Sequence, residues 1–150
     1  MSLERQRQEY SVLPRGGVYD LVSTAQSGAD SETRLRAVAA LGKSGDPRAV
    51  RPVADLLYDA DPQIRLFSAI ALGLLRSGRP VDDLVVRLRD RTEHAAIREQ
   101  AAVALAAIRS TGAVRGLREF VADGDEEGSL RTLTENLLKE IGAEWVSAGT

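Results

Sequence analysis

Several residue types that build chemical sites are scarce or missing in this sequence. It contains no cysteine, which excludes disulfide bonds, zinc sites held by thiolates and a cysteine nucleophile. One histidine is present, whereas metal sites built on imidazole usually need several. Aromatic residues make up 4% of the 150 residues, a share that suits helices packed through small side chains better than a β-sandwich. These shortages favour a helical protein with few routes to catalysis.

The sequence also lacks a segment that would direct it to a membrane or out of the cell. Its first residues, MSLERQRQEY, have no apolar stretch of the kind found in signal peptides. No hydrophobic run approaches the roughly 18 residues that a membrane span needs. We therefore expect a soluble protein in the cytoplasm, without a membrane partner.

A strong surplus of one charge is absent as well, because the net charge is -2. Residues 121–150 hold seven acids and two bases, whereas the rest of the chain holds 18 bases and 15 acids. This distribution is a mild polarity along the chain. It is not the basic surplus that is typical of proteins that bind nucleic acids.

Internal repeats are the clearest pattern that is present. The stretch TRLRAVAALGKSGDPRAV from Thr33 returns 31 residues later as IRLFSAIALGLLRSGRPV, and 33 residues after that as IREQAAVALAAIRSTGAV. A fourth copy begins at Leu130. Each copy contains an arginine, followed seven residues later by a leucine. These register arginines are Arg34, Arg65, Arg98 and Arg131, and the leucines are Leu41, Leu72, Leu105 and Leu138.

Each repeat is predicted to hold two helices. The positions three, six and seven residues after the register arginine share one face of a helix, and many of them are small, so neighbouring first helices can approach closely. A second apolar stripe begins sixteen residues after the arginine, at Val50, Val81 and Val114. Between the helices, glycine is expected to end the first helix and proline to open the second, as in Gly45-Asp46-Pro47.

A single hairpin of this kind cannot bury its apolar face, so the repeats must stack. The predicted fold is an all-α, right-handed superhelix of about three full hairpins with half-repeats at its ends. We expect an N-terminal arm at 1–15, a solenoid at 16–142 and a C-terminal cap at 143–150, with Trp145 folded over the open core. The predicted helices cover 16–27, 31–43, 47–58, 61–76, 80–90, 93–109, 111–122 and 127–141.

These residues resemble the HEAT-like repeats named after phycobilisome lyases. In that pattern an acid precedes an arginine, and Ala-Leu-Gly, Gly-Asp-Pro and a valine follow. Asp30, Arg34, 39–42, 45–47 and Val50 match it closely. The second repeat matches well, whereas the third has His94 in place of the acid and Ala106 in place of the glycine. The resemblance covers about 16–142 and implies the solenoid fold, with the second helices on its concave side. It does not define a function.

An acid stands four residues before the register arginine in Asp30/Arg34, Asp61/Arg65 and Glu127/Arg131. An acid at a helix start caps free N–H groups and suits the helix dipole. The arginine can then pair with that acid or with the next repeat. We interpret these pairs as a structural ladder, with an anion site as the alternative.

No catalytic, cofactor or metal site is predicted. The fold also resembles that of deoxyhypusine hydroxylases, and this resemblance implies several His-Glu pairs as iron ligands, but here Glu93-His94 occurs once. Gly-x-Ser-x-Gly and phosphate-loop motifs are absent. Asp82-Asp83 and the acids of 123–127 are interpreted as solvated or capping residues. We therefore predict that the chain is not an enzyme.

The remaining candidate is the surface of the second helices, which we predict to bind another protein or peptide. Tyrosine and arginine are favoured at interfaces, because both combine apolar area with directional donors. The alternatives are a solvated face without a partner, a lyase-like or chaperone-like subunit acting on a tetrapyrrole-bearing protein, and a nucleic-acid-binding protein. The oligomeric state stays open. The candidate residues are Tyr19, Asp20, Arg48, Arg51, Asp55, Tyr58, Asp82, Arg87, Arg115, Arg118 and Glu119.

Overall fold

A computed structural model describes residues 17–123 and 128–148, and every regular element in these ranges is helical. Most of the predicted helix boundaries agree with it to within two residues. The helices are α2 (Val18–Ser27), α3 (Ser31–Ser44), α4 (Val50–Asp55), α5 (Pro62–Leu75), α6 (Val81–Arg89), α7 (Ala95–Ile108), α8 (Thr111–Ala122) and α9 (Ser129–Ala148), and two 3₁₀ turns, η1 (Pro47–Ala49) and η2 (Leu56–Tyr58), flank α4.

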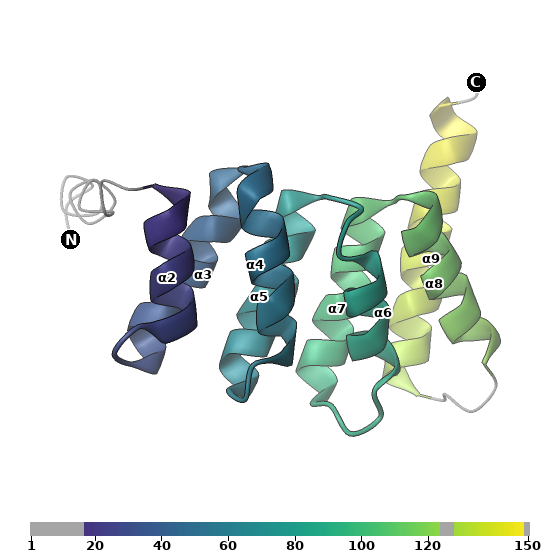
Figure 1. Ribbon diagram of the computed structural model, residues 1–150. Coiled ribbons are helices and arrows are strands. Elements are labelled where there is room, and N and C mark those ends of the chain that lie inside the picture. Colours follow the sequence, from purple (N-terminus) through teal and green to yellow (C-terminus); the bar gives the residue numbers. More distant parts are fainter. Residues whose placement is uncertain (1–16, 124–127, 149–150) are drawn as a thin grey trace, which may run out of the picture.

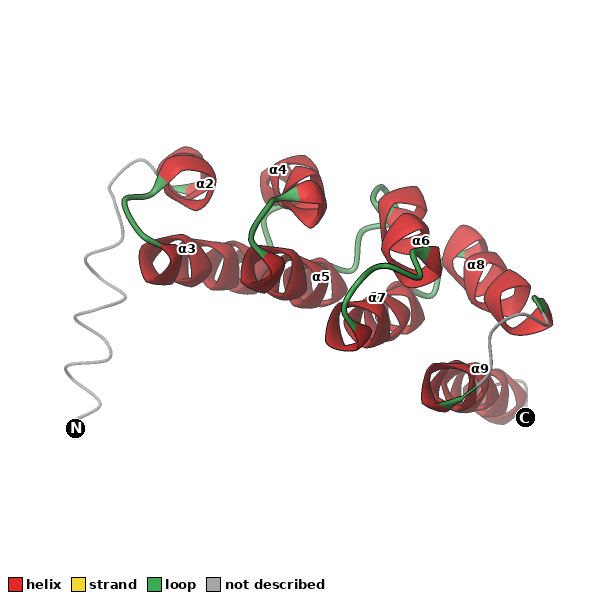
Figure 2. Cartoon of the chain, turned by 90° about the horizontal axis from the view of Figure 1, so that it is seen from below, coloured by secondary structure: helices red, strands yellow, loops and turns green. Residues whose placement is uncertain are grey.

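The helices form stacked hairpins, as Figure 1 shows. Viewed along the helices, α3, α5, α7 and α9 form one row and α2, α4, α6 and α8 form the other (Figure 2). The full hairpins are α3–α4, α5–α6 and α7–α8, with α2 and α9 as half-repeats at the ends of the described chain. The predicted all-α superhelix is therefore confirmed.

The row of first helices is held together by small residues at the contact points. A Cβ atom added to Gly42 of α3 would lie 2.8 Å from the Cα atom of Ala71 in α5. At the next contact, a Cβ atom on Gly73 would lie 3.2 Å from the Cα atom of Ala104 in α7. The repeat pattern therefore places glycine opposite alanine where two helix backbones come closest.

The register leucines lie in the core, as the repeat pattern predicts. Leu41, Leu72 and Leu105 are all fully buried. Leu138, at the same position of the last repeat, is only partly buried. The first three leucines are enclosed by helices on both sides, whereas α9 contacts α7 and α8 on one side only.

Three features of the helices differ from the prediction. The segment 47–58 is a short α-helix between two 3₁₀ turns, because Pro52 lacks the N–H that would bond the carbonyl of Arg48. Among α3, α5 and α7, only α3 is followed by a glycine, Gly45 (φ 64°). Arg76 (φ 55°) and Arg109 (φ 58°) take the same left-handed position after α5 and α7.

The last helix also runs further than predicted, to Ala148 in place of residue 141. The segment after Ile141 contains no proline, and a single helical glycine, here Gly142, costs only about 1 kcal/mol. The predicted packing of Trp145 over the core and the predicted N-terminal arm at 1–15 lie outside the described side chains and residues.

Candidate functional site

The candidate residues lie on the surface formed by α2, η1, α4, η2, α6 and α8, which we call the second-helix face. Most of the predicted side chains are exposed there, whereas Asp20 and Arg87 are partly buried. That this face binds a partner, and that it is concave, stay predictions.

A cluster around Tyr58 connects α4 with α6. The Tyr58 hydroxyl donates to Oδ1 of Asp83 at 2.8 Å, although the side chain is 52% exposed. Arg51 donates to Oδ2 of the same carboxylate at 2.9 Å and also pairs with Asp55 at 3.2 Å. The Arg87 guanidinium lies 5.2 Å from the centre of the Tyr58 ring. These contacts hold an accessible tyrosine in one orientation.

The same arrangement of tyrosine and arginine occurs one repeat earlier. The Arg48 guanidinium lies 5.5 Å from the ring centre of Tyr19, which is 69% exposed on α2. Arg48 also pairs with Asp46 at 2.7 Å. A cation over an aromatic ring at an exposed site contributes about 0.5–1 kcal/mol. The second-helix face therefore presents two tyrosines, each beside a charged neighbour that limits its motion.

Asp83 is the residue of this cluster that the sequence prediction missed. The sequence interpretation of Asp82 and Asp83 is a pair of solvated or capping residues, but of the two only Asp82 is exposed. Asp83 stands 32 residues after Arg51, which lies between the two repeat spacings of 31 and 33. That spacing was the available signal for a contact between neighbouring second helices.

Burial and the nearby Asp83 carboxylate both raise the pKa of Tyr58 above its ordinary value of 10.0. Burial is the larger cause, since it disfavours the phenolate, and the carboxylate adds a hydrogen bond to the neutral form. Tyr58 therefore acts at neutral pH as an uncharged hydrogen-bonding group and not as a base.

Of the two pairings left open for the register arginines, Arg34 and Arg65 make the one toward the next repeat. Asp30 caps α3 by accepting from the N–H of Thr33 at 2.7 Å. Arg34 pairs instead with Asp59, in the loop before the next repeat, and donates to the carbonyl of Ala25 at 2.8 Å. Arg34 thus connects the preceding second helix to the following repeat, which is a structural role.

The second register arginine, Arg65, belongs to a buried group of three charged side chains. Arg65 donates to both carboxylate oxygens of Glu93 at 2.9 Å, and Arg87 donates to Oε2 of the same residue at 2.8 Å. The Glu93 side chain is 1% exposed. Burial alone would raise its pKa, but the hydrogen bonds from Arg65, from the His94 N–H and from Arg87 outweigh burial and lower the pKa below the ordinary value of 4.5.

The other two register arginines, Arg98 and Arg131, make different contacts. Arg98 donates to the carbonyl of Leu88 at 2.9 Å, which repeats the backbone contact of Arg34. Arg131 pairs with Glu135 of its own helix at 3.0 Å. The predicted partner of Arg131, Glu127, lies outside the described residues. Asp61 caps α5 by accepting from the N–H of Gln63 at 2.9 Å.

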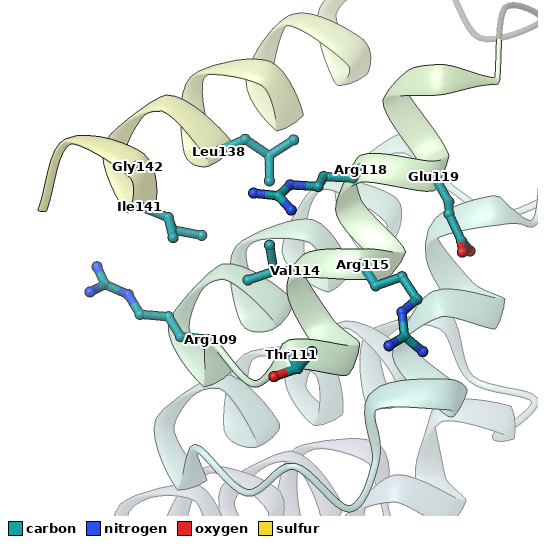
Figure 3. Close-up of a pocket in the computed structure, with 9 residues that line it drawn as sticks. All are labelled: Arg109, Thr111, Val114, Arg115, Arg118, Glu119, Leu138, Ile141 and Gly142. Carbon is teal, nitrogen blue, oxygen red and sulfur yellow. The ribbon is translucent and has the colours of Figure 1, made fainter. Parts of the chain in front are cut away.

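A pocket of about 700 Å³ lies between α8 and α9 (Figure 3). Val114, Leu138 and Ile141 supply apolar lining. Arg118 extends from α8 toward Leu138, whereas Glu119 extends along the other side of α8. The full lining is Arg109, Thr111, Val114, Arg115, Arg118, Glu119, Leu138, Ile141 and Gly142.

A smaller hollow of about 370 Å³ lies on the opposite row, between α5 and α7. Ile70, Leu74 and Val103 line it and are 40%, 57% and 38% exposed. The sequence prediction did not identify this patch. Its residues stand five and nine positions after a register arginine, outside the core stripe, and their apolar character was the available signal.

The described parts of the chain show two further negative findings. No group of three or more histidine, cysteine, aspartate or glutamate side chains among residues 17–123 and 128–142 is arranged to hold a metal ion. No helix within the described residues is long and apolar enough to cross a membrane.

Stacked helical hairpins with closely packed first helices define the molecule as an α-solenoid. The sequence model of the family described as HEAT repeats matches residues 50–138, and the chain belongs to this family. The model described as PBS lyase HEAT-like repeat matches residues 33–59, which confirms the resemblance seen in the first repeat.

Among solved structures, the chain is similar to human deoxyhypusine hydroxylase in complex with glycerol. The TM-score is 0.72 at 26% sequence identity, over 81% of this chain and 42% of that protein's chain. The chain therefore spans less than half of that protein's length. No curated protein matches the sequence.

Proposed function

We propose that this chain is a non-catalytic binding module that binds a protein or peptide on its second-helix face. HEAT repeats commonly mediate protein binding, so membership of the family supports this class of function. The observation that carries the proposal is the Tyr58 cluster. Tyrosine and arginine are the side chains most often found to dominate binding energy, and here both are exposed or half-exposed on one surface.

The cluster also lowers the entropy lost on binding. Tyr58 is held by the Asp83 carboxylate at 2.8 Å and by the Arg87 guanidinium over its ring. Ordering a mobile side chain at an interface costs about 0.5–1.5 kcal/mol, and a side chain that is already ordered avoids most of this cost. A partner would therefore meet a preformed aromatic surface.

The absence of catalysis is part of this proposal. The sequence has one histidine, and its neighbour Glu93 already accepts hydrogen bonds from Arg65, Arg87 and the His94 N–H. A carboxylate used in this way is not available as a metal ligand or a general base. His94 itself precedes α7, where its carbonyl accepts from the N–H of Ile97 at 3.0 Å. These contacts favour a structural role for the Glu93-His94 pair.

The alternative functions have less support. Nucleic-acid binding would need a basic surface, but Arg48, Arg51, Arg87 and Arg89 of the second-helix face each pair with an acid. A lyase-like or chaperone-like role on a tetrapyrrole-bearing protein rests on the family resemblance alone. Mixing the chain with a bilin and recording its absorbance tests that role. A cytoplasmic location is also part of the proposal.

Affinity capture from the source cell, with quantitative mass spectrometry, tests the proposed function. The wild-type chain is compared with the variant Arg51→Ala/Tyr58→Ala/Arg115→Ala, and with the control Arg36→Ala/Leu74→Ala on the first-helix side. We expect a protein that the wild type and the control recover and the first variant loses. Equal recovery by all three folded chains would show that the second-helix face is not the binding surface.

A further inference from the structure

The arginines of the second-helix face differ in whether the chain itself neutralises them. Nearest charged N···O distances are 2.7 Å for Arg48–Asp46, 2.9 Å for Arg51–Asp83, 2.8 Å for Arg87–Glu93 and 3.2 Å for Arg89–Asp123. Arg115 and Arg118 of α8 are exposed. Neither makes an ion pair or side-chain hydrogen bond within the described structure. The positive charge that the described residues leave uncompensated on this face therefore lies on α8.

Both arginines line the pocket between α8 and α9. Arg118 extends toward Leu138, whereas Arg115 extends on the side of α8 where Glu119 lies (Figure 3). Besides Arg115 and Arg118, the lining holds Arg109, which has a partner within the chain, and one acid, Glu119. Val114, Leu138 and Ile141 give the pocket an apolar wall on both helices. The pocket thus combines a surplus of positive charge with an apolar surface, over a volume of about 700 Å³.

The apolar wall includes a position that is covered in every other repeat. Leu41, Leu72 and Leu105 stand at the same register as Leu138 and are fully buried, whereas Leu138 is partly exposed. Within the described residues, no second helix packs beyond α8 over this leucine. An apolar side chain from a partner can therefore bury surface here that the described residues leave in contact with water.

We propose that this pocket binds an acidic peptide segment that carries an aliphatic or aromatic side chain between its carboxylates. The carboxylates pair with Arg115 and Arg118, whose planar guanidinium groups suit bidentate contacts. The apolar side chain of the segment packs on Leu138 and its neighbours. This inference rests on the proposed function, because α8 belongs to the second-helix face, and it adds the chemistry of the partner.

The same pocket fits a nucleic acid less well. Proteins that bind single strands stack bases on aromatic side chains, and none of the residues that line this pocket is aromatic. A phosphate backbone would leave the apolar wall unused. An acidic and apolar peptide uses both parts of the lining.

The test uses the full chain, labelled with ¹⁵N, and a short synthetic peptide with glutamates and leucines at helical spacing. We expect saturable shifts of the amide signals of Val114, Leu138 and Gly142. The variant Arg115→Glu/Arg118→Glu should lower the affinity for the peptide by about tenfold or more, because each charge pair changes from attraction to repulsion. A peptide with lysines in place of the glutamates should then bind this variant better than it binds the wild type.

The control Arg36→Glu changes an exposed arginine of α3, far from the pocket, and should leave the affinity unchanged. The inference is overturned if the acidic peptide does not bind, if the charge-reversed variant binds it as well as the wild type does, or if the lysine peptide binds the wild type equally well. It is also overturned if a single-stranded oligonucleotide shifts these amides and the acidic peptide does not.

The two proposals can fail separately. If capture is lost in the variant Arg51→Ala/Tyr58→Ala, which leaves Arg115 in place, but the acidic peptide does not bind, only the chemistry assigned to the pocket is wrong. If the peptide binds at the pocket but capture of a partner is the same in all variants, the pocket chemistry stands and the proposed function of the face fails.

Discussion

Replacing Glu93 by glutamine tests the role of the buried ladder. The carboxylate accepts four hydrogen bonds: two from Arg65 at 2.9 Å, one from Arg87 at 2.8 Å and one from the His94 N–H at 3.0 Å. Glu93→Gln keeps the shape of the side chain but removes the charge that the two guanidinium groups share. Arg65 and Arg87 then lose the buried anion between them, and Arg87 keeps the longer ion pair with Asp90 at 3.5 Å.

The expected cost follows from burial. Removing one partner of a buried ion pair costs about 3–5 kcal/mol. Arg65 and Arg87 keep some contact with water, since their side chains are 16% and 14% exposed. The Nε atom of Arg87 is already buried without a hydrogen bond, so this atom offers no contact that could replace the one lost with Glu93. We therefore expect Glu93→Gln to lower the free energy of unfolding by about 3 kcal/mol, the lower end of that range.

Urea unfolding followed by far-UV circular dichroism measures this loss. The control is Glu99→Gln, the same chemical change on α7 at a residue without an ion pair in the described structure. We expect the control to stay within about 0.5 kcal/mol of the wild type. A loss below about 1 kcal/mol for Glu93→Gln, the size of an ordinary exposed pair, would refute the reasoning.

Because of the Glu93 carboxylate, the free energy of unfolding should depend on pH in a known direction. The pKa of Glu93 is lowered from 4.5 in the folded chain: burial opposes the shift, and the hydrogen bond from Arg65 is the largest cause in its favour. A lowered folded pKa contributes stability that is present above the unfolded pKa and is lost as the pH falls through the folded value. The pKa of Asp59 is lowered in the same way, where the hydrogen bond from Arg34 outweighs burial. Acid should therefore destabilise the wild type below about pH 4.5, and the Glu93→Gln variant less steeply.

Other changes test the packing, the helix ends and the tyrosine cluster. Gly42→Ala forces α3 away from α5 and should lower the free energy of unfolding by about 1–2 kcal/mol in a urea titration. Gly142→Ala, with open space around its Cβ position, should be neutral or raise it by up to about 1 kcal/mol. Arg76→Gly relieves a left-handed residue (φ 55°) and should raise the melting temperature. In an ultraviolet titration Tyr58 should ionise above its ordinary pKa of 10.0, and Asp83→Asn should lower that pKa.

The parts of the fold that depend on periodic positions could be predicted from the sequence. The spacing from Arg34 to Leu41 and its repetitions placed the first helices and their buried face. The length of a repeat placed the second helices. These features follow from the helical period and from the need of each hairpin to bury one face, and both are visible in the order of residues.

Contacts between loops and helices could not be predicted in the same way. The acid that pairs with Arg34 is Asp59, six residues before the next register arginine, whereas the acid that pairs with Arg65 is Glu93, five residues before the next one. These loops differ in length, so no fixed spacing identifies the partner. Burial of Glu93 depends on how the loop before α7 packs, which is a property of the assembled stack.

The candidate site was predicted in part for the same reason. The exposed tyrosines and arginines could be placed on the second helices by periodicity. The role of Asp83 depends on the distance between α4 and α6, and the pocket beside Leu138 depends on the direction in which α9 runs. Neither quantity is encoded in the pattern of one repeat.

Photochemical cross-linking tests the central claim, that partners bind the second-helix face, most directly. Benzoylphenylalanine is placed at Tyr58 in one chain and at Leu74, on the other row, in a second chain. Both positions are exposed, at 52% and 57%, so the label is equally accessible. We predict a covalent adduct with the partner protein from the label at Tyr58 and none from the label at Leu74. An adduct from the label at Leu74 alone would contradict the account.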